Sequence, residues 1–184
     1  MRNFLFIFLM LCSSLSFAEP RFRPASWGLS IIGTELDNFY WVDAGIYRSE
    51  QPDDDNFSNL SKLGIKEILN LREYHSDDEA EEHHFKVHRV KMNAAKVTAA
   101  QLLESLKIIK NRKKPILIHC WHGSDRTGVT VAAYRMVFQN WTKEQAIDEM
   151  VNGNYGYHSS IYPNLLVLLK SIDIAKMRKD LGLE

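Results

Sequence analysis

A short apolar segment, followed by a glycine-containing loop and a helix, constrains the fold of this chain most. Residues 115–119 begin at Pro115, continue through three aliphatic residues and end at His119. A run of this kind is typical of a parallel strand that is buried on both faces of a sheet. From Thr127 to Gln139 the apolar residues then recur with helical spacing. These two elements predict a central sheet that is covered by helices.

The other segments alternate between the periods of strands and of helices. Strands are predicted over residues 39–42, 45–48, 65–71 and 85–90. Helices are predicted from Pro52 to Leu63, from Thr98 to Lys110, from Thr142 onward, and from Ile161 to Met177. Residues 72–84 are polar and rich in acids, which predicts an exposed loop. The chain is therefore predicted to be a single-domain α/β protein, a three-layer sandwich whose central, mostly parallel sheet is flanked by helices.

The first 18 residues have the pattern of a secretory signal peptide. Arg2 gives a positive start, an apolar run follows, and Ser16 and Ala18 occupy the small positions of a cleavage site. We expect cleavage after Ala18, a periplasmic or secreted protein, and no stable membrane insertion afterwards, because the apolar run is short for a bilayer. An uncleaved anchor or a buried first helix is the alternative. Residues 19–38 are predicted to be an extended N-terminal segment ahead of a folded domain over residues 39–184.

Charge and cysteine content narrow the classes of function. Lys and Arg balance Asp and Glu at 23 each, so nothing predicts a nucleic-acid partner, and any attraction for anions must be local. Of the two cysteines, Cys12 lies in the predicted signal peptide, where Leu11 disfavours lipid attachment. The processed chain would keep only Cys120, either as a small buried apolar residue or as a reactive thiol.

The loop between the apolar strand and the helix indicates whether Cys120 is a buried apolar residue or a reactive thiol. Backbone amides that converge at a helix N-terminus form a cradle for an anion, and Gly123 permits the close turn that the cradle needs. Arg126, at the far end of the loop, can hold two oxygens of a phosphoryl group. The same positive field favours the thiolate of Cys120. The pattern predicts covalent phosphoryl transfer through a phosphocysteine, with no metal and no cofactor.

These residues resemble a known signature. His-Cys-x5-Arg-Thr-Gly over residues 119–128 is similar to the signature of the protein tyrosine phosphatase superfamily. Residues 47–52 and 68–72 resemble compact dual-specificity-like phosphatases, which include enzymes that act on inositol pyrophosphates. The resemblance implies a cysteine phosphatase domain over residues 39–184. It also implies that His119 sets the geometry and acidity of Cys120, and that Thr127 places its hydroxyl near the sulfur and assists the second step.

The sequence departs from the superfamily at the acid that protonates the leaving group. These enzymes normally carry an Asp on a separate loop upstream of the cysteine, and here Asn93 falls near that place. Asp125, inside the cysteine loop, is the favoured replacement, and it is similar in position to the loop Asp of myotubularin-type lipid phosphatases. The alternative is a structural carboxylate that orients Arg126 or caps the next helix. Asp77 and Asp78 form a second candidate pair.

Other side chains are candidates for binding the substrate. The predicted phosphate-binding residues are Trp121, His122, Gly123, Ser124, Asp125 and Arg126. Trp121 and His122 either line the pocket or pack beneath neighbouring elements. Arg72, Lys91 and Lys96 are candidates for positive charge at the rim. His75, His83, His84 and His88 lie near Glu81 and Glu82, but neighbouring histidines on a polar run do not point at one centre, so no metal site is expected.

The resemblance and the expected export favour a small phosphate ester as the substrate. A soluble inositol polyphosphate such as phytate is the first prediction, and a phosphotyrosine or dual-specificity protein substrate is the alternative. A catalytically weak phosphate-binding module belongs to a different class of function, and a sulfurtransferase is a third option. The intact pair of Cys120 and Arg126 favours an enzyme over a binding module. The sequence makes no prediction of the oligomeric state.

Overall fold

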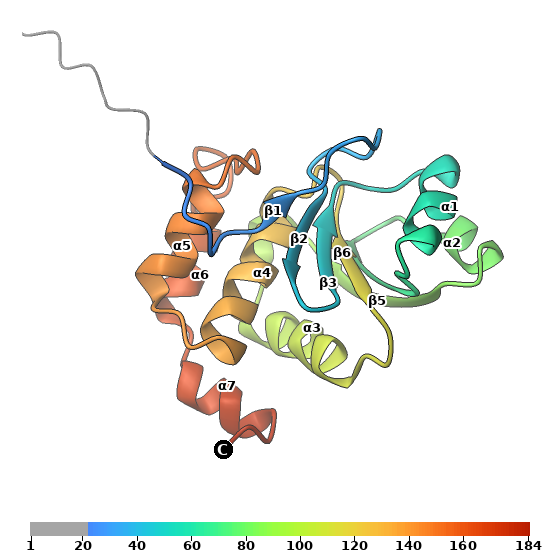
Figure 1. Cartoon of the computed structure of the whole chain (residues 1–184). Coiled ribbons are helices and arrows are strands. Elements are labelled where there is room, and N and C mark those ends of the chain that lie inside the picture. The colour runs from blue at the N-terminus through green and yellow to red at the C-terminus, as the bar shows by residue number, and fades with distance from the viewer. Residues whose placement is uncertain (1–21) are drawn as a thin grey trace, which may run out of the picture.

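A mixed sheet forms the centre of the molecule. The computed structural model describes residues 22–184, so the predicted signal peptide and its cleavage after Ala18 lie outside the described residues. The sheet has six strands in the order β1-β2-β3-β6-β4-β5 (Figure 1). The strands are β1 (Leu29–Ser30), β2 (Tyr40–Asp43), β3 (Ile46–Ser49), β4 (Glu67–Arg72), β5 (Lys86–Met92) and β6 (Ile116–His119).

Strand direction divides this sheet into two parts. β3, β6, β4 and β5 run parallel to one another, whereas at one edge β2 is antiparallel to both β3 and β1. The β2–β3 hairpin turns through Ala44 and Gly45, and Gly45 has a φ of +70°, which glycine adopts without strain. β6 lies between β3 and β4, so its carboxyl end is at the middle of the sheet, as a wholly buried strand predicts.

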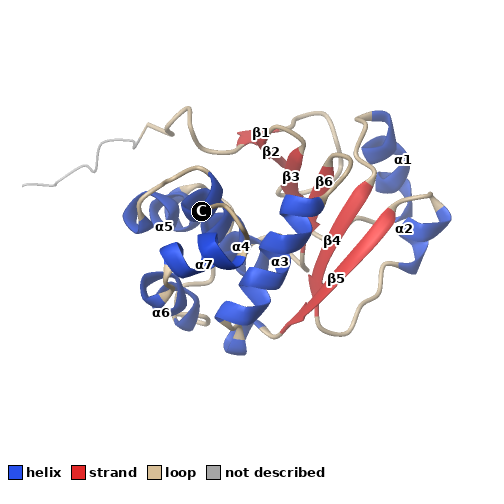
Figure 2. Ribbon diagram, turned by 90° about the horizontal axis from the view of Figure 1, so that it is seen from below, coloured by secondary structure: helices blue, strands red, loops and turns tan. Residues whose placement is uncertain are grey.

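Helices cover both faces, which confirms the predicted three-layer α/β sandwich. One face carries α1 (Asp54–Lys62) and α2 (Asp78–Glu82), which pack on a smaller apolar core. The opposite face is covered by the remaining helices (Figure 2) and carries the larger core. Its helices are α3 (Ala99–Asn111), α4 (Asp125–Phe138), α5 (Lys143–Asn152), α6 (Asn164–Ser171) and α7 (Ile174–Asp180). A single 3-10 turn, η1 (Ala94–Lys96), precedes α3 in the described part of the chain.

Helix starts follow the local sequence closely. The side-chain oxygens of Thr98 and Thr142 each accept a hydrogen bond from the backbone amide of the third helical residue, which is a Gln in both helices. The side chain of that Gln in turn accepts a hydrogen bond from the backbone amide of the capping Thr. Asp53 and Asn56 form the same arrangement at α1. Each such cap contributes about 1 kcal/mol to helix stability. These local bonds explain why the predicted starts of α3 and α5 are confirmed.

Two predictions for the secondary structure were wrong. Residues 72–84 are not simply an exposed loop, because α2 forms within them and Asp77 is fully buried. The predicted helix over residues 161–177 is divided into α6 and α7. Ile172 is extended there, and the side chain of Asp173 caps a new helix by accepting from the amide of Lys176. A strong N-cap residue in mid-sequence favours this interruption.

The N-terminal segment packs against the rest of the domain. β1 pairs with β2, and Trp27 and Leu36 are buried. The amide of Gly28 donates to the carboxylate of Glu149 on α5, over 2.7 Å. Among residues 22–184, no helix has the length and apolar character needed to cross a bilayer.

Candidate active site

The cysteine loop, residues 120–126, connects the carboxyl end of β6 to the start of α4. Cys120 is 2% exposed and follows His119, whose register partners are Ser49 on β3 and Asn70 on β4. None of the backbone amides of residues 121–126 donates to another described residue. The loop thus gathers uncommitted donors at the N-terminus of a 14-residue helix, where the helix dipole favours negative charge.

Donors behind the loop hold its carbonyl groups. The carbonyl of Gly123 accepts from Arg48 Nη2 over 2.6 Å, and that of Trp121 accepts from the amide of Gln51 over 2.9 Å. The carbonyl of His122 accepts from Asn38 Nδ2 over 2.7 Å. Contacts from β3 and the N-terminal segment therefore fix the backbone conformation of the cysteine loop.

Gly123 is required at its position for two reasons. Its φ is +70°, a conformation that residues with a Cβ rarely adopt. A Cβ at this position would also lie 2.4 Å from the carbonyl oxygen of Ser49. The close approach of the loop to β3 therefore depends on the missing side chain.

A buried acid supports the histidine that precedes the nucleophile. His119 is fully buried, its Nε2 lies 2.7 Å from Asp77 Oδ2, and its Nδ1 lies 3.2 Å from the carbonyl oxygen of Cys120. Asp77 also accepts from Gln51 over 2.8 Å. Burial alone would raise the pKa of Asp77, but the hydrogen bond and charge of His119, together with Gln51 and His75, lower it below its ordinary value. Asp77 therefore lies beneath the loop as an ionised partner of His119.

Arg48 is a second buried support that the sequence reasoning did not assign. It is 1% exposed, and its guanidinium carbon lies 3.7 Å from the ring centre of Tyr155. Burial lowers the pKa of Arg48, and the charges of Tyr155, Glu149 and Cys120 oppose that effect. Tyr155 in turn donates to Glu149, which pairs with Arg135 over 2.8 Å. The resemblance of residues 47–52 to related phosphatases was the only sequence signal for this network.

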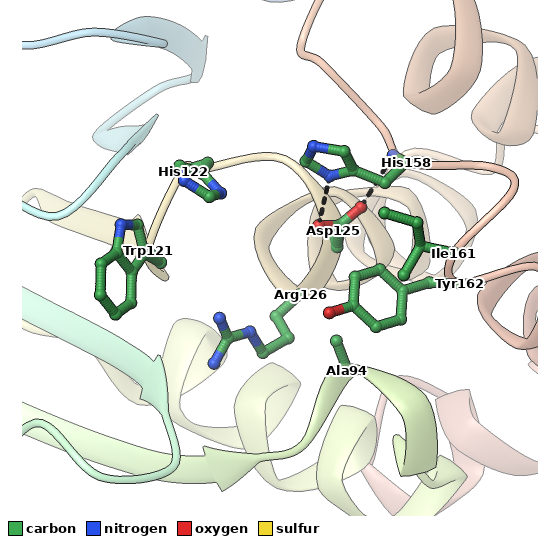
Figure 3. Close-up of a pocket in the computed structure, with 8 residues that line it drawn as sticks. All are labelled: Ala94, Trp121, His122, Asp125, Arg126, His158, Ile161 and Tyr162. Atoms are coloured by element: carbon green, nitrogen blue, oxygen red, sulfur yellow. Dashed lines mark hydrogen bonds and ion pairs between the residues drawn. The ribbon is translucent and has the colours of Figure 1, made fainter.

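Arg126 lies between two adjacent depressions on the front of the loop. The first is lined by Ala94, Trp121, His122, Asp125, Arg126, His158, Ile161 and Tyr162 (Figure 3). The second shares several of these residues and adds Arg72, Glu73, Tyr74, Met92 and Asn93. Arg126 Nη1 lies 3.4 Å from the carbonyl oxygen of Met92. Its Nε, like the buried hydroxyl of Thr127, has no hydrogen-bond partner among the described residues.

Asp125 lines the first depression and is bound to the segment after α5. One carboxylate oxygen accepts from the amide of His158 over 3.0 Å, and the other lies 2.9 Å from His158 Nδ1 (Figure 3). Ser124 is buried, and its hydroxyl donates to the carbonyl of His122 over 3.3 Å. Asp125 thus joins the cysteine loop to the opposite wall of the depression.

Trp121 and Arg72 form the mouth of the site. Trp121 is 57% exposed, and the guanidinium carbon of Arg72 lies 4.4 Å from its ring centre. Burial lowers the pKa of Arg72, the neighbouring charge of Arg126 lowers it further, and Asp77 and Cys120 oppose these effects. Two guanidinium groups therefore line the second depression at the mouth. The other rim candidates, Lys91 and Lys96, are exposed and line neither depression.

Three of the four upstream histidines are paired with carboxylates. His75 lies 3.2 Å from Asp77, His83 lies 2.8 Å from Asp54, and His88 lies 2.7 Å from Glu67. In the described part of the chain, no three His, Cys, Asp or Glu side chains converge as a metal site would require.

Comparisons with known proteins agree with this geometry. A family model described as "Tyrosine phosphatase family" matches residues 34–160. The dual specificity protein phosphatase TpbA of Pseudomonas aeruginosa is 32% identical over 123 residues, which cover 65% of this chain and 56% of TpbA. The inositol diphosphatase SIW14 of Saccharomyces cerevisiae is 35% identical over 124 residues, or 61% of this chain and 44% of the relative. This chain thus matches about half the length of these curated relatives.

Solved structures show the same fold. A crystal structure of P. aeruginosa TpbA superposes with a TM-score of 0.77 at 25% identity, covering 86% of this chain and 98% of the solved one. Because the superposition covers 86% of this chain, the likeness extends well beyond the cysteine loop.

Proposed function

The chain belongs to the tyrosine phosphatase family, and from this premise we propose that it hydrolyses phosphomonoesters through a phosphocysteine intermediate. One observation carries the proposal. The amides of residues 121–126, directly after Cys120, donate to no other described residue, and Arg126 in the same loop has an unpartnered Nε. Such donors stabilise the negative charge on a phosphoryl group as its ester bond breaks.

The proposed reaction has two steps. Cys120 Sγ attacks phosphorus, the bond to the leaving oxygen breaks, and that oxygen takes up a proton. Water then attacks the phosphocysteine, the S–P bond breaks, and phosphate leaves. We propose that His119, held by Asp77, positions Cys120 and that the buried hydroxyl of Thr127 stabilises the departing sulfur. Asp125 remains the sequence-based candidate for the proton donor. No step requires a metal or a cofactor.

Inositol polyphosphates are the first proposed substrate class. Arg72 and Arg126 line the same depression, and the charge of Arg126 contributes to the lowered pKa of Arg72, so a ligand with more than one phosphate would suit this pair of cations. Several relatives are named inositol diphosphatases, from yeast and from plants. The signal-peptide pattern over residues 1–18 supports the accompanying proposal that the chain is exported and meets soluble phosphate esters.

Phosphotyrosine is a second candidate with an observation of its own. Trp121 and Tyr74, which are 57% and 89% exposed, stand with Tyr162 around the depression beside Arg126. Aromatic side chains in this arrangement suit the ring of an aromatic phosphate ester. A structure of the Pseudomonas relative was solved in complex with pTyr.

Phosphate release by the purified protein tests both proposals. Phytate and a phosphotyrosine peptide are assayed with a chelator present, alongside the Cys120→Ser variant. We expect release from phytate that persists in chelator and disappears in the variant. Release from the peptide alone would assign the second substrate class. Activity that survives in Cys120→Ser would refute the mechanism, and no covalent phosphate on Cys120 would indicate a binding module.

A further inference from the structure

Asn93 is bonded to a carboxylate. Its Oδ1 accepts from the amide of Ala95 over 3.0 Å, and its Nδ2 lies 3.0 Å from Glu73 Oε2. The first contact fixes which end of the amide is the acceptor, so Nδ2 must be the donor to Glu73. A carboxylate therefore lies one hydrogen bond away from the residue that occupies the usual place of the leaving-group acid.

Glu73 is held at the mouth of the site. It directly follows β4, and its backbone carbonyl accepts from Arg89 Nη2 over 3.0 Å. Its side chain lines the same depression as Arg126 and Trp121. Arg126 Nη1 lies 3.4 Å from the carbonyl oxygen of Met92, the residue before Asn93. The phosphate clamp and the carboxylate thus border the same small space.

The other acids near the loop are more fully engaged. Both oxygens of Asp125 contact His158, and Asp77 is fully buried beneath the loop with His119 and Gln51. Only one oxygen of Glu73 has a hydrogen-bond partner among the described residues. Glu73 therefore keeps one oxygen that can carry a proton toward the space in front of Arg126.

We propose that Glu73, oriented by Asn93, donates the proton to the leaving oxygen, an inference that rests on the proposed phosphatase function. As Cys120 Sγ bonds to phosphorus and the ester P–O bond breaks, the proton moves from Glu73 to the departing oxygen. The resulting carboxylate then takes a proton from the water that attacks the phosphocysteine. Each cycle consumes one water and returns Glu73 to its protonated form.

Glu73→Gln tests the proposal through its dependence on the leaving group. On phenyl phosphate, whose leaving group needs protonation, we expect a loss of about 10²- to 10⁴-fold in kcat/KM, which reports the step that forms the phosphocysteine. On p-nitrophenyl phosphate, whose leaving group departs without a proton, we expect a much smaller loss in kcat/KM and an intact burst of p-nitrophenol, followed by a slower steady rate because the water that attacks the phosphocysteine has lost its base. Glu79→Gln, an exposed position on α2, is the matched control. Asp125→Asn is assayed in parallel.

The outcomes separate this inference from the proposed function. An inactive wild-type protein would refute the phosphatase proposal itself. If the wild type is active but Glu73→Gln loses kcat/KM equally on both substrates or on neither, Glu73 is not the acid. A loss that depends on the leaving group in Asp125→Asn instead would assign the proton to Asp125 and overturn the inference.

A double variant sharpens the test. Combining Glu73→Gln with Asn93→Asp exchanges the acid and the amide, keeps the net charge and preserves a donor and an acceptor for the bond between them. We expect the double variant to recover part of the rate on phenyl phosphate that Glu73→Gln loses. A double variant slower than Glu73→Gln on that substrate would place the acid elsewhere.

Discussion

The residues beneath the cysteine loop, here called the floor, and those around the entrance of the site, called the mouth, differ in how deeply their side chains are buried and in how they are paired. Beneath the cysteine loop, Asp77 and His119 are fully buried and bonded to each other, and Arg48 is 1% exposed against Tyr155. At the mouth, Trp121 is 57% exposed and Tyr74 is 89% exposed. Burying the charges of the floor costs desolvation free energy, which their paired partners offset. At the mouth, more than half of each aromatic side chain stays in contact with solvent.

This difference indicates that the two regions have separate roles. A buried, paired network has few alternative arrangements, so it can hold the backbone of the cysteine loop in one conformation. Under the proposed function, exposed side chains at the mouth would contact the part of a substrate beyond its phosphate. Changes to the floor should therefore alter folding and catalysis together, and changes to the mouth should alter substrate preference with little effect on folding.

The largest expected effect follows from breaking the buried ion pair of Glu149 and Arg135, which contacts the floor through Tyr155. Glu149 pairs with Arg135, and both are 2% exposed. Glu149→Ala leaves Arg135 buried without its counter-charge, so we expect unfolding free energy to fall by about 3–5 kcal/mol. Urea unfolding measures the change, with the exposed Glu104→Ala on α3 as control. A loss below about 1 kcal/mol, the average for point mutations, would show that the pair is not needed.

A smaller effect is expected from the acid under His119. Asp77→Asn removes a charged hydrogen-bond acceptor, which should cost about 1.5–3 kcal/mol at neutral pH together with part of the turnover. The pKa of Asp77 is lowered in the folded protein from its ordinary value of 3.8, because His119, Gln51 and His75 outweigh burial. The ionised acid therefore stabilises the fold above about pH 4. This contribution disappears as the pH falls toward the lower pKa of the folded state.

The unfolding free energies of the wild type and of Asp77→Asn, compared at neutral pH and near pH 3, test the direction of this pH dependence. The wild type should lose its advantage over Asp77→Asn as the pH falls, so the two curves should converge. An advantage that grows in acid would mean that burial, not His119, controls the ionisation of Asp77.

The smallest change in stability is expected at the mouth. Trp121→Ala should alter unfolding free energy by no more than about 0.5 kcal/mol, since the ring is mostly exposed. If the ring stacks on an aromatic ester, its loss costs about 0.5–1.5 kcal/mol. That range corresponds to a rise of about two- to twelvefold in KM for a phosphotyrosine peptide, with phytate less affected. An equal rise in KM for both substrates would show that the Trp121 ring does not stack on an aromatic ester.

Local chemistry explains what the sequence by itself determined. The strand before Cys120, the caps at Thr98 and Thr142, and the positive φ of Gly123 all depend on residues close together in the chain. The α/β class and the cysteine loop were predictable for that reason. The division between α6 and α7 was missed because the apolar pattern continues across the interruption at Asp173.

Only the tertiary structure decided which side chains meet around the loop. Asp77 lies 42 residues before His119, and Arg48 lies 75 residues before Gly123. Glu73 meets Asn93 because β4 and β5 run parallel and end side by side. Sequence periodicity reports which face of an element is buried, but not which strand becomes its neighbour. These contacts were set by the strand order β3-β6-β4-β5, a property of the whole sheet.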